Sequence, residues 1–537
     1  MDRRTFLGAA TGGAIATLLP MSAARAQSTG RPETIPALRE WTATGGQFSL
    51  CASSRVITGD AGLHREAELL AGELGLPLDS GPVQPGDIAL DRYAGDAELG
   101  PEGYRLEISG AVTISANAAA AGAFYGNRSL RQLLARGQPL PGGVARDWPR
   151  YPERGLMVDT GRKHFSAAWL ASRIEEMAWL KLNYLHLHFT ENLGWRIECD
   201  GHPEVVSDEH LTKTEVRELL ALADRYHITV VPELDLPGHM GAALEAHPEH
   251  QLRDLLGRPN ANNLDYTLPA ARQFAFELID EYVDLFPGPY WHTGADEYLT
   301  TIPAVPTPVD YALYPQLESY ARQRYGSNAT AKDGILGLVN EVDDFVRARG
   351  KTLRVWNDGL SGGRTIVLDP DVIVEWWSDL DGRHPPQLLA AGHHIMNCGW
   401  YPTYYVTGFP GGFVPGWPRE VTFPNVARPE DAYEAWEPHS FHGPLRLYRI
   451  DLTQPYVIDP AEPAHRGSKL HVWCDDPTAQ TVDEIATGIA PYLSIMAQQT
   501  WGSAPLAASY ADFRPIVDRV GRPSDEVELG VCAPDIA

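Results

Sequence analysis

Short apolar segments alternate with amphipathic stretches along most of the chain beyond residue 155. The apolar segments have the length of buried strands, and several of the stretches between them repeat their apolar positions with the period of a helix. The pattern predicts helices at 167–181, 214–226, 270–285 and 334–349, and strands at 155–160, 184–189, 229–235, 290–296, 353–357, 372–377, 393–397 and 470–473.

Strands that alternate with helices indicate parallel β/α units. Eight such units predict an α/β fold with a closed (β/α)8 barrel of the TIM type. An open doubly wound sheet is the alternative. It is less favoured because no G-x-G-x-x-G sequence opens a helix after any of these strands.

The residues before the barrel have a different pattern. Residues 27–150 combine short strands at 104–108 and 112–115 with one amphipathic helix at 119–135, which predicts a small α/β domain. A Pro-Gly-rich stretch at 138–143, followed by residues 147–152, indicates a domain boundary. We therefore expect the barrel at 151–505 and a C-terminal tail at 506–537.

Residues 1–26 are typical of a twin-arginine export signal. Arg3 and Arg4 precede a mild apolar run at 7–20, and Ala24-Arg25-Ala26 fits an A-x-A cleavage site. A short membrane anchor is the alternative, but the run falls short of the ~20 residues that a spanning helix needs. We expect an exported protein without a membrane span after processing, in the periplasm or outside the cell.

Composition narrows the classes of partner. The 44 Lys and Arg residues against 70 Asp and Glu give a net charge of −26, which disfavours nucleic acid and anionic membrane surfaces as partners. The five cysteines leave one disulfide possible. They form no C-x-x-C pair, which argues against a zinc ribbon or a dithiol centre.

Polar residues cluster where the predicted strands end. In a (β/α)8 barrel the active site lies at the carboxyl ends of the strands. The residues there are Asp159, His188, Glu191, Asp235, His239, Asp296, Glu297, Trp356, Asp358, Trp377, Trp473 and Asp475. Carboxylates accept hydrogen bonds from hydroxyls and tryptophans stack on rings, so this set favours a neutral polyhydroxylated ligand.

Asp296 and Glu297 are the most distinctive pair in this set. They follow Gly294 at a strand end, where the chain leaves the pleat and both side chains are free to enter one site. A like-charged neighbour and apolar surroundings raise the pKa of a carboxyl group, which suits it to act as a general acid.

Four ordered motifs carry a family resemblance. They are YPERGLMVD at 151–159, HLHFTENLGWRI at 186–197, VPELDLPGH at 231–239 and GADE at 294–297. They resemble the signatures of the family 20 glycoside hydrolases, the β-N-acetylhexosaminidases. The resemblance covers residues 100 to 500 and includes GPEGYRL at 100–106, which is similar to part of the family's small α/β domain.

The resemblance implies a retaining hydrolase in which the 2-acetamido oxygen of the substrate attacks its own anomeric carbon and forms an oxazolinium intermediate. The enzyme then needs no nucleophile, cofactor or metal of its own. By resemblance Glu297 is the acid and base, and Asp296 orients the acetamide. His239, with Glu191 behind it, poises Glu297.

The resemblance also implies residues that bind the sugar. Arg154 would hold O3 and O4, and Asp475 would hold O4 or O6. Tyr404, with Tyr405 as the alternative, would bond the acetamide oxygen. The walls of the sugar site would be Trp356, Trp377 and Trp473.

The implied substrate is an oligosaccharide or glycoconjugate with a terminal β-linked GlcNAc or GalNAc, cleaved by an exo-β-N-acetylhexosaminidase. The variants ENLG, ADEY and W-x-D are instead similar to the lacto-N-biosidase branch, which releases a galactosyl-GlcNAc disaccharide. A guanidinium forked onto O3 and O4 would clash with a sugar attached at O3, so Arg154 favours monosaccharide release. A pocket for 6-substituted GlcNAc is a third alternative.

Two other classes compete with this interpretation. His186 and His188 resemble the paired metal ligands of amidohydrolase barrels, but they lie on the second strand instead of the first. Packing inside the barrel with a satisfied hydrogen bond is their favoured role. A sugar-binding protein without catalysis would share the acidic and aromatic residues, yet it would not need an Asp-Glu pair facing a histidine.

Overall fold

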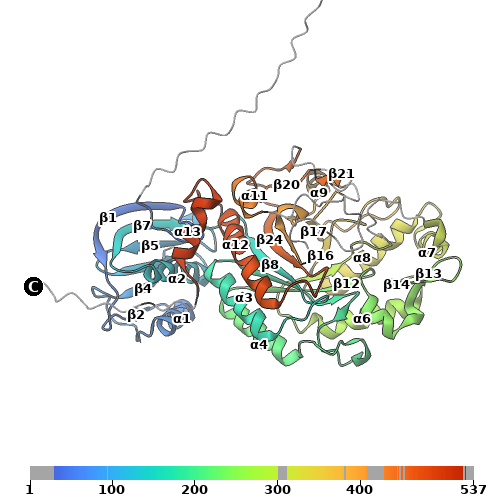
Figure 1. Cartoon of the computed structure of the whole chain (residues 1–537), viewed down its shortest axis with the longest axis horizontal. Coiled ribbons are helices and arrows are strands. Elements are labelled where there is room, and N and C mark those ends of the chain that lie inside the picture. The colour runs from blue at the N-terminus through green and yellow to red at the C-terminus, as the bar shows by residue number, and fades with distance from the viewer. Residues whose placement is uncertain are drawn as a thin grey trace, which may run out of the picture.

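The computed structural model describes residues 30–523 and residue 527, except for 94, 300–310, 380–382, 408–427, 444, 447–448, 451–453 and the positions between 523 and 527. The export signal expected at residues 1–26 lies outside the described residues. The described chain forms a small domain followed by a barrel (Figure 1).

The small domain is a seven-stranded sheet packed against helices α1 (His64–Leu74) and α2 (Ala120–Ala135). Its strands, in spatial order, are β1 (Glu40–Phe48), β7 (Leu140–Asp147), β5 (Tyr104–Ile108), β6 (Val112–Ala116), β4 (Ile88–Arg92), β2 (Val56–Ile57) and β3 (Leu78–Asp79). Burial alternates along β5 and β6, as expected for strands with one face on the core. The predicted strands and helix of this domain are confirmed.

Strand β7 is a correction to the sequence interpretation. Residues 138–143 were expected to begin a domain boundary, but β7 starts within them and pairs antiparallel with both β1 and β5. The glycines have a packing role, because a Cβ at Gly143 would lie 2.0 Å from the ring of Trp41. The connection between the domains therefore begins only after Asp147.

The barrel is closed and has eight parallel strands. In order they are β8 (Glu153–Asp159), β9 (Tyr184–His188), β12 (Thr229–Leu236), β15 (Tyr290–Gly294), β16 (Thr352–Trp356), β17 (Ile373–Trp376), β18 (Ile395–Asn397) and β24 (His465–Trp473). Pairing of β24 with both β8 and β18 closes the ring. All eight predicted strands are confirmed, and the (β/α)8 barrel replaces the open-sheet alternative. Strands buried on both faces account for the near-continuous apolar runs.

Helices cover the barrel where the sequence pattern predicts them. The four expected helices are α3 (Ala167–Trp179), α4 (Lys213–Arg225), α6 (Pro269–Val283) and α8 (Ala331–Arg347). Thr212 and Glu215 form a capping box that starts α4, and Thr481 and Glu484 form one that starts α12 (Val482–Trp501).

The remaining elements lie mostly in the βα loops and at the C-terminal end. They are β10 (Thr190–Glu191), β11 (Gly194–Trp195), α5 (Gly241–Ala246), β13 (Gln251–Arg253), β14 (Pro259–Leu264), α7 (Pro315–Tyr325), α9 (Pro385–Ala390), α10 (Trp400–Thr403), β19 (Tyr404–Val406), α11 (Pro429–Glu434), β20 (Ser440–Phe441), β21 (Leu445–Arg446), β22 (Arg449–Ile450), β23 (Tyr456–Val457) and α13 (Tyr510–Val520).

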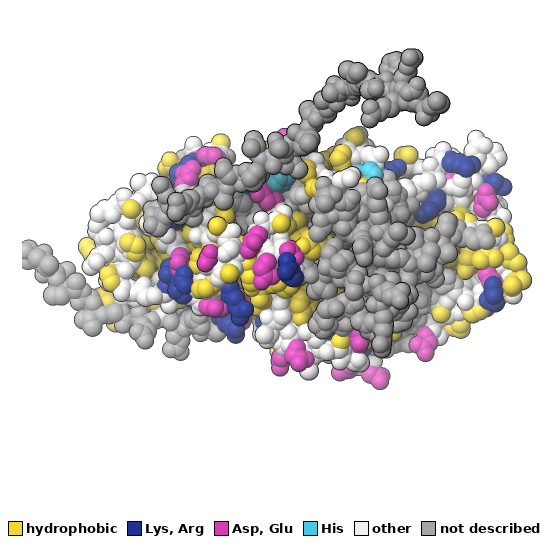
Figure 2. All heavy atoms as spheres, turned by 45° about the horizontal axis from the view of Figure 1, so that its top comes forward, with side chains coloured by type: hydrophobic (Ala, Val, Ile, Leu, Met, Phe, Trp, Pro, Cys, Tyr) yellow, Lys and Arg dark blue, Asp and Glu magenta, His cyan; other side chains and the backbone are white. Residues whose placement is uncertain are grey.

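The residues expected as a C-terminal tail contain α13. This helix contacts α2 and α11, and the rings of Phe513 and Tyr433 stack with centroids 4.3 Å apart (Figure 1). Among the described residues, no helix is long and apolar enough to cross a membrane. Figure 2 shows Lys and Arg side chains interspersed with Asp and Glu on the described part of one face.

Buried ion pairs join the two domains. Lys181, which follows α3, lies 3.0 Å from Asp147 of β7, and both side chains are fully buried. Trp501 of α12 donates its indole N–H to the other Asp147 oxygen at 2.8 Å. Burial lowers the pKa of Lys181, while the charge of Asp147 opposes this shift. Lys181 therefore depends on Asp147 to stay charged.

We expect Asp147→Asn to destabilise the protein by about 3–5 kcal/mol, because it leaves the Lys181 charge buried without a counter-ion. Chemical denaturation of both proteins measures this difference. Glu318→Gln is the control, since its pair with Arg322 is about half exposed and such pairs contribute at most about 1 kcal/mol. Equal losses in the two variants would contradict the role of Asp147.

Candidate active site

One pocket opens at the carboxyl ends of the barrel strands. The side chains that line it are Arg162, Glu191, Asp235, His239, Asp296, Glu297, Trp356, Trp377, Trp400, Tyr404, Trp473 and Asp475. The set contains nine of the ten residues to which the family resemblance gave a role. Arg154 is the exception.

Asp296 and Glu297 both reach this pocket because the backbone after β15 is unusual. Gly294, Ala295 and Glu297 all have positive φ values, of 66°, 68° and 48°. Gly294 is required sterically, since a Cβ there would lie 1.8 Å from an oxygen of Asp235. Left-handed backbone at non-glycine residues costs energy and persists at functional sites, where it sets side-chain direction. The chain thus leaves the pleat where the sequence predicted.

Asp358 holds this turn in place. One of its oxygens accepts the backbone N–H of Glu297 at 2.8 Å, and the other accepts the indole N–H of Trp377 at 2.7 Å. Burial, and then the negative charges of Asp296 and Glu297, raise the pKa of Asp358 well above its usual value. A single carboxyl group therefore fixes both the catalytic turn and an aromatic wall.

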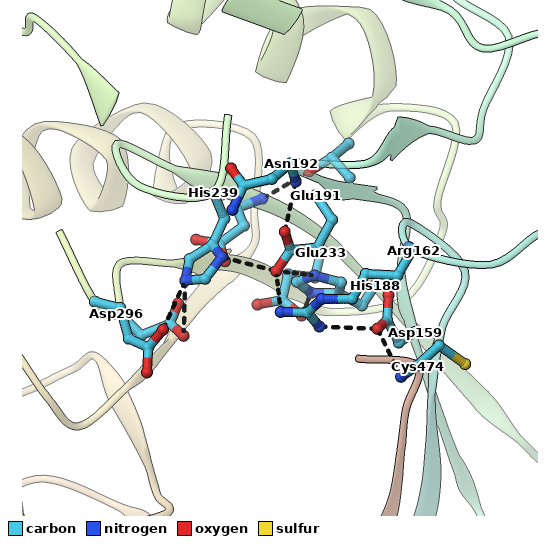
Figure 3. A network of polar contacts seen from close by, with 12 residues as sticks. Asp159, Arg162, His188, Glu191, Asn192, Glu233, His239, Asp296 and Cys474 are labelled. Atoms are coloured by element: carbon cyan, nitrogen blue, oxygen red, sulfur yellow. Dashed lines mark hydrogen bonds and ion pairs between the residues drawn. The ribbon is translucent and has the colours of Figure 1, made fainter. Parts of the chain in front are cut away.

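His239 lies between Glu191 and the carboxylate pair (Figure 3). Its Nδ1 is 2.7 Å from Glu191, and its Nε2 is 3.4 Å from Glu297 and 3.6 Å from Asp296. Burial alone would lower the pKa of His239, but the charges of Glu191 and Asp296 raise it well above its usual value. These charges favour the protonated form of His239, whose Nε2 is directed at Glu297.

Glu297 has the properties of a general acid. Burial raises its pKa above the ordinary value, although the contact with His239 pulls in the opposite direction. The pKa of Glu191 is instead held low, because the charges of Arg162 and His239 outweigh burial. The pKa values of Glu297 and Glu191 are thus shifted in opposite directions, an arrangement that suits one carboxyl group to act as the acid.

Arg162 is the main functional residue that sequence reasoning missed. It lies 2.8 Å from Asp159 and 2.5 Å from Glu191 (Figure 3). Its Nε is 3.9 Å from Asp475. Its guanidinium also lies 5.3 Å from the centre of the Trp473 ring. The sequence signal that could have identified Arg162 is its position three residues after Asp159, an aspartate at a strand end.

Aromatic side chains form the walls of the pocket. Trp356 donates its indole N–H to buried Glu233 at 2.8 Å, and its ring lies 5.9 Å from that of Trp473. Tyr404 belongs to the same wall, and its ring centroid lies 5.8 Å from that of Trp473. Tyr405 accepts a hydrogen bond from Gln480 instead, and of the two candidates Tyr404 is the one that lines this pocket. Trp400, not anticipated from the sequence, completes this wall.

Family models match both domains of the chain. Residues 151–443 match the catalytic domain of glycosyl hydrolase family 20, and residues 31–148 match domain 2 of that family. The chain belongs to glycosyl hydrolase family 20. Its matched catalytic domain is a glycoside hydrolase domain of that family.

Relatives of this family 20 enzyme are named for different activities. The chain is 32% identical to a lacto-N-biosidase from Bifidobacterium bifidum over 92% of its own length, but it spans only 42% of that relative. It is 27% identical to a β-N-acetylhexosaminidase from Cellulomonas fimi, over 90% of this chain and 94% of the relative. The crystal structure of a β-N-acetylhexosaminidase from Bacteroides fragilis has the same fold, with a TM-score of 0.71, 23% identity, and coverage of 91% and 96% of the two chains.

The position of Arg154 is a correction. In this family 20 enzyme it lies near the start of β8, whereas the pocket lies beyond the strand's other end, about 17 Å away at ~3.3 Å per residue. Its side chain is fully buried and donates to Glu102 of the small domain at 2.8 Å. Arg154 joins the domains, and Arg162 is the arginine that faces the pocket.

His186 and His188 lie inside the barrel, beneath the lining of the pocket. They contact Glu233 at 2.9 and 2.5 Å, and His292 approaches the same carboxylate at 3.0 Å. Lys469 lies 2.6 Å from the other nitrogen of His186. Both histidines are therefore packed and hydrogen-bonded in the interior, and they hold the carboxylate that fixes Trp356.

We expect His239→Gln to shift the alkaline limb of the pH profile upward. His239 lowers the pKa of Glu297, so its removal lets burial raise that pKa further. Activity that needs protonated Glu297 would then persist to higher pH, although with a lower maximum. The measurement is kcat/KM against pH for both proteins, with His210→Gln as a surface control. A downward shift or an unchanged limb would contradict this coupling.

Proposed function

We propose that this enzyme is a retaining exo-β-N-acetylhexosaminidase that uses the acetamido group of its substrate as the nucleophile. The observation that carries the proposal is the adjacent pair Asp296 and Glu297 in one pocket, with His239 against both. Two carboxyl groups that are adjacent in sequence suit this mechanism, because one acts as the acid and the other stabilises the acetamide. A separate protein nucleophile would require an ionised carboxylate on the opposite side of the sugar.

The other carboxyl groups of the pocket are poorly suited to nucleophilic attack. Glu191 is occupied by Arg162 and His239. Burial, together with the charge of Asp296, raises the pKa of Asp235 well above its usual value, which favours its neutral form. Asp475 lies 3.9 Å from the Nε of Arg162, the guanidinium that also holds Asp159 and Glu191. These environments support a mechanism in which the substrate supplies the nucleophile.

The reaction would proceed in two steps. Glu297 donates its proton to the glycosidic oxygen while the acetamido oxygen bonds to the anomeric carbon, and the glycosidic bond breaks. Asp296 accepts the acetamide N–H and stabilises the positive charge of the oxazolinium ring, and Tyr404 donates to the acetamido oxygen. Ionised Glu297 then takes a proton from water, which attacks the same carbon and restores the acetamide with net retention.

The proposed substrates are oligosaccharides or glycoconjugates that end in β-linked GlcNAc or GalNAc. Arg162 supports release of a single sugar. Its two terminal nitrogens contact Asp159 and Glu191, and its Nε faces Asp475. Each terminal nitrogen carries a second N–H, and this pair can bind hydroxyls such as O3 and O4. A second sugar on O3 would then collide with the guanidinium. The argument first made for Arg154 thus applies to Arg162.

Lacto-N-biosidase activity is the second candidate. The observation in its favour is the 32% identity to a relative of that name across 92% of this chain. The variants ENLG and W-x-D, which contain Glu191 and Asp475, agree with it.

The deciding experiment compares hydrolysis of p-nitrophenyl β-GlcNAc with that of p-nitrophenyl β-lacto-N-bioside. We expect cleavage of the monosaccharide glycoside, with slower turnover in Glu297→Gln. Release from the disaccharide glycoside alone would establish the biosidase and overturn the proposed role of Arg162. Retention is tested separately, by following the anomer of the first product with NMR.

We also propose that the enzyme is exported by the twin-arginine route, on the strength of Arg3, Arg4 and the A-x-A site at 24–26. Fractionation of producing cells tests this. Activity confined to the cytoplasm would contradict it.

A further inference from the structure

Two His-Pro-Glu turns lie side by side on the surface of the barrel domain, outside the pocket. One is His202-Pro203-Glu204, and the other is His247-Pro248-Glu249. The two histidine rings are 5.9 Å apart, and both pack on Phe274 of α6 with centroid distances of 4.9 and 4.6 Å. His250 lies on the same ring at 5.3 Å. The phenyl ring is thus a fixed platform that orients the imidazoles.

Three donor atoms converge between these turns. The Oε1 of Glu204 lies 3.1 Å from Nδ1 of His202 and 2.8 Å from Nε2 of His247. The donor atoms of the three residues all lie within 4.8 Å of one another. The imidazoles are 19% and 20% exposed and Glu204 is 44% exposed, so solvent reaches the point of convergence.

The outer nitrogen of each ring also faces a carboxylate. Nε2 of His202 lies 3.3 Å from Glu277, and Nδ1 of His247 lies 3.2 Å from Glu249. A neutral imidazole has one N–H and one lone pair. With a carboxylate oxygen against each of its nitrogens, a neutral ring must direct a lone pair at an oxygen unless a cation lies between them.

This arrangement is the one that zinc-binding histidines have. Such histidines donate their second N–H to a carboxylate, which fixes the tautomer and leaves the other nitrogen free to bind the metal. The third donor is the Glu204 carboxylate, because one of its oxygens faces a ring nitrogen of both histidines.

We propose that His202, Glu204 and His247 bind one Zn²⁺ ion, with Glu249 and Glu277 behind the two histidines and solvent at the remaining position. Two imidazole nitrogens and one carboxylate form a donor set typical of Zn²⁺, whereas Ca²⁺ and Mg²⁺ prefer oxygen ligands alone. The three surrounding carboxylates favour a divalent cation over an anion or a neutral ligand at this place.

The proposed ion would join two segments that border the active site. Glu204 lies in the loop after β11, and His247 directly follows α5. The first amide of α5, at Gly241, donates to Asn192 at 3.1 Å, next to the Glu191 that holds His239. The site is separate from the sugar pocket, so we assign it a stabilising role and no part in the chemistry.

Titration of the untagged, chelator-treated protein with ZnCl2 tests the proposal, with calorimetry for affinity and thermal melting for stability. We expect one equivalent to bind tightly and the melting temperature to rise. His202→Gln and His247→Gln should each abolish this binding, and Glu277→Gln should weaken it about 10- to 100-fold. The matched control is His210→Gln, a nearby histidine that instead contacts the Ser207 carbonyl at 2.8 Å.

The pocket itself contains a histidine and carboxylates, so His239→Gln is a second control and should retain the zinc. Loss of zinc in His239→Gln but not in His202→Gln would place the ion in the pocket and overturn the proposal. Failure of the wild-type protein to bind zinc, or equal binding by His202→Gln, would also overturn it. His202→Gln should hydrolyse the aryl glycoside at the wild-type rate, so this test is independent of the proposed function.

Discussion

Glu297→Gln is expected to lower kcat by about 10²- to 10⁴-fold while the protein remains folded, because general acid–base catalysis contributes a factor of this size. The amide has nearly the same shape as the carboxyl group but cannot donate a proton to the glycosidic oxygen. It still accepts the interactions with His239 that hold the side chain in place. Steady-state kinetics and circular dichroism together measure the effect.

The leaving group distinguishes loss of the acid from structural damage. Dinitrophenolate leaves without protonation. The kcat/KM of Glu297→Gln, which reports the first step, should therefore fall much less for a dinitrophenyl glycoside than for a natural disaccharide. Structural damage would reduce both rates equally. Near-normal turnover of the disaccharide would refute the assignment of Glu297.

The barrel was predictable from the sequence because its strands are buried on both faces, and burial leaves a direct apolar signal. The strand ends were predictable for the same reason, and they located Asp296, Glu297 and His239. Strand β7 was not predictable, because Pro141 and two glycines resemble a linker. Only the structure shows that the ring of Trp41 occupies the space above Gly143. Local composition does not reveal a contact made across a sheet.

The incorrect assignment of Arg154 to the pocket has a physical cause. The motif at 151–159 contains the arginine, but only its last residue, Asp159, stands at the carboxyl end of the strand. Direction along the strand therefore decides between the domain interface and the pocket. Arg162 lies beyond the motif, and its spacing from Asp159 is its one sequence signal. Its place depends on Asp159 and Glu191, which come from different strands.

Choices between neighbours and pairings across long separations also needed the structure. Tyr404 and Tyr405 are equivalent in sequence, yet adjacent residues on an extended segment face opposite sides, and only Tyr404 meets the pocket. The two His-Pro-Glu turns are each unremarkable alone. Their convergence on Glu204 depends on how α5 and the loop after β11 pack on Phe274.

Asp296→Asn is the variant that separates the proposed mechanism from one with a protein nucleophile. We expect kcat to fall by about 10²- to 10³-fold, the size of effect seen when one preorganised electrostatic group is removed. The asparagine has the same size but no negative charge to stabilise the acetamide N–H as it becomes positive. A GlcNAc-thiazoline, which mimics the oxazolinium ring, should bind the wild-type enzyme tightly and Asp296→Asn far less tightly.

The same variant should bind the product GlcNAc with little change, because its acetamide carries no positive charge. This contrast between intermediate mimic and product isolates the electrostatic role of Asp296 from simple contact with the sugar. Trapping of a covalent glycosyl-enzyme on Asp296 with a fluorinated glycoside would contradict the mechanism, since that carboxylate would then be the nucleophile itself. Indifference of the wild-type enzyme to the thiazoline would contradict it as well, because an enzyme that forms the oxazolinium ring must hold it more firmly than either substrate or product.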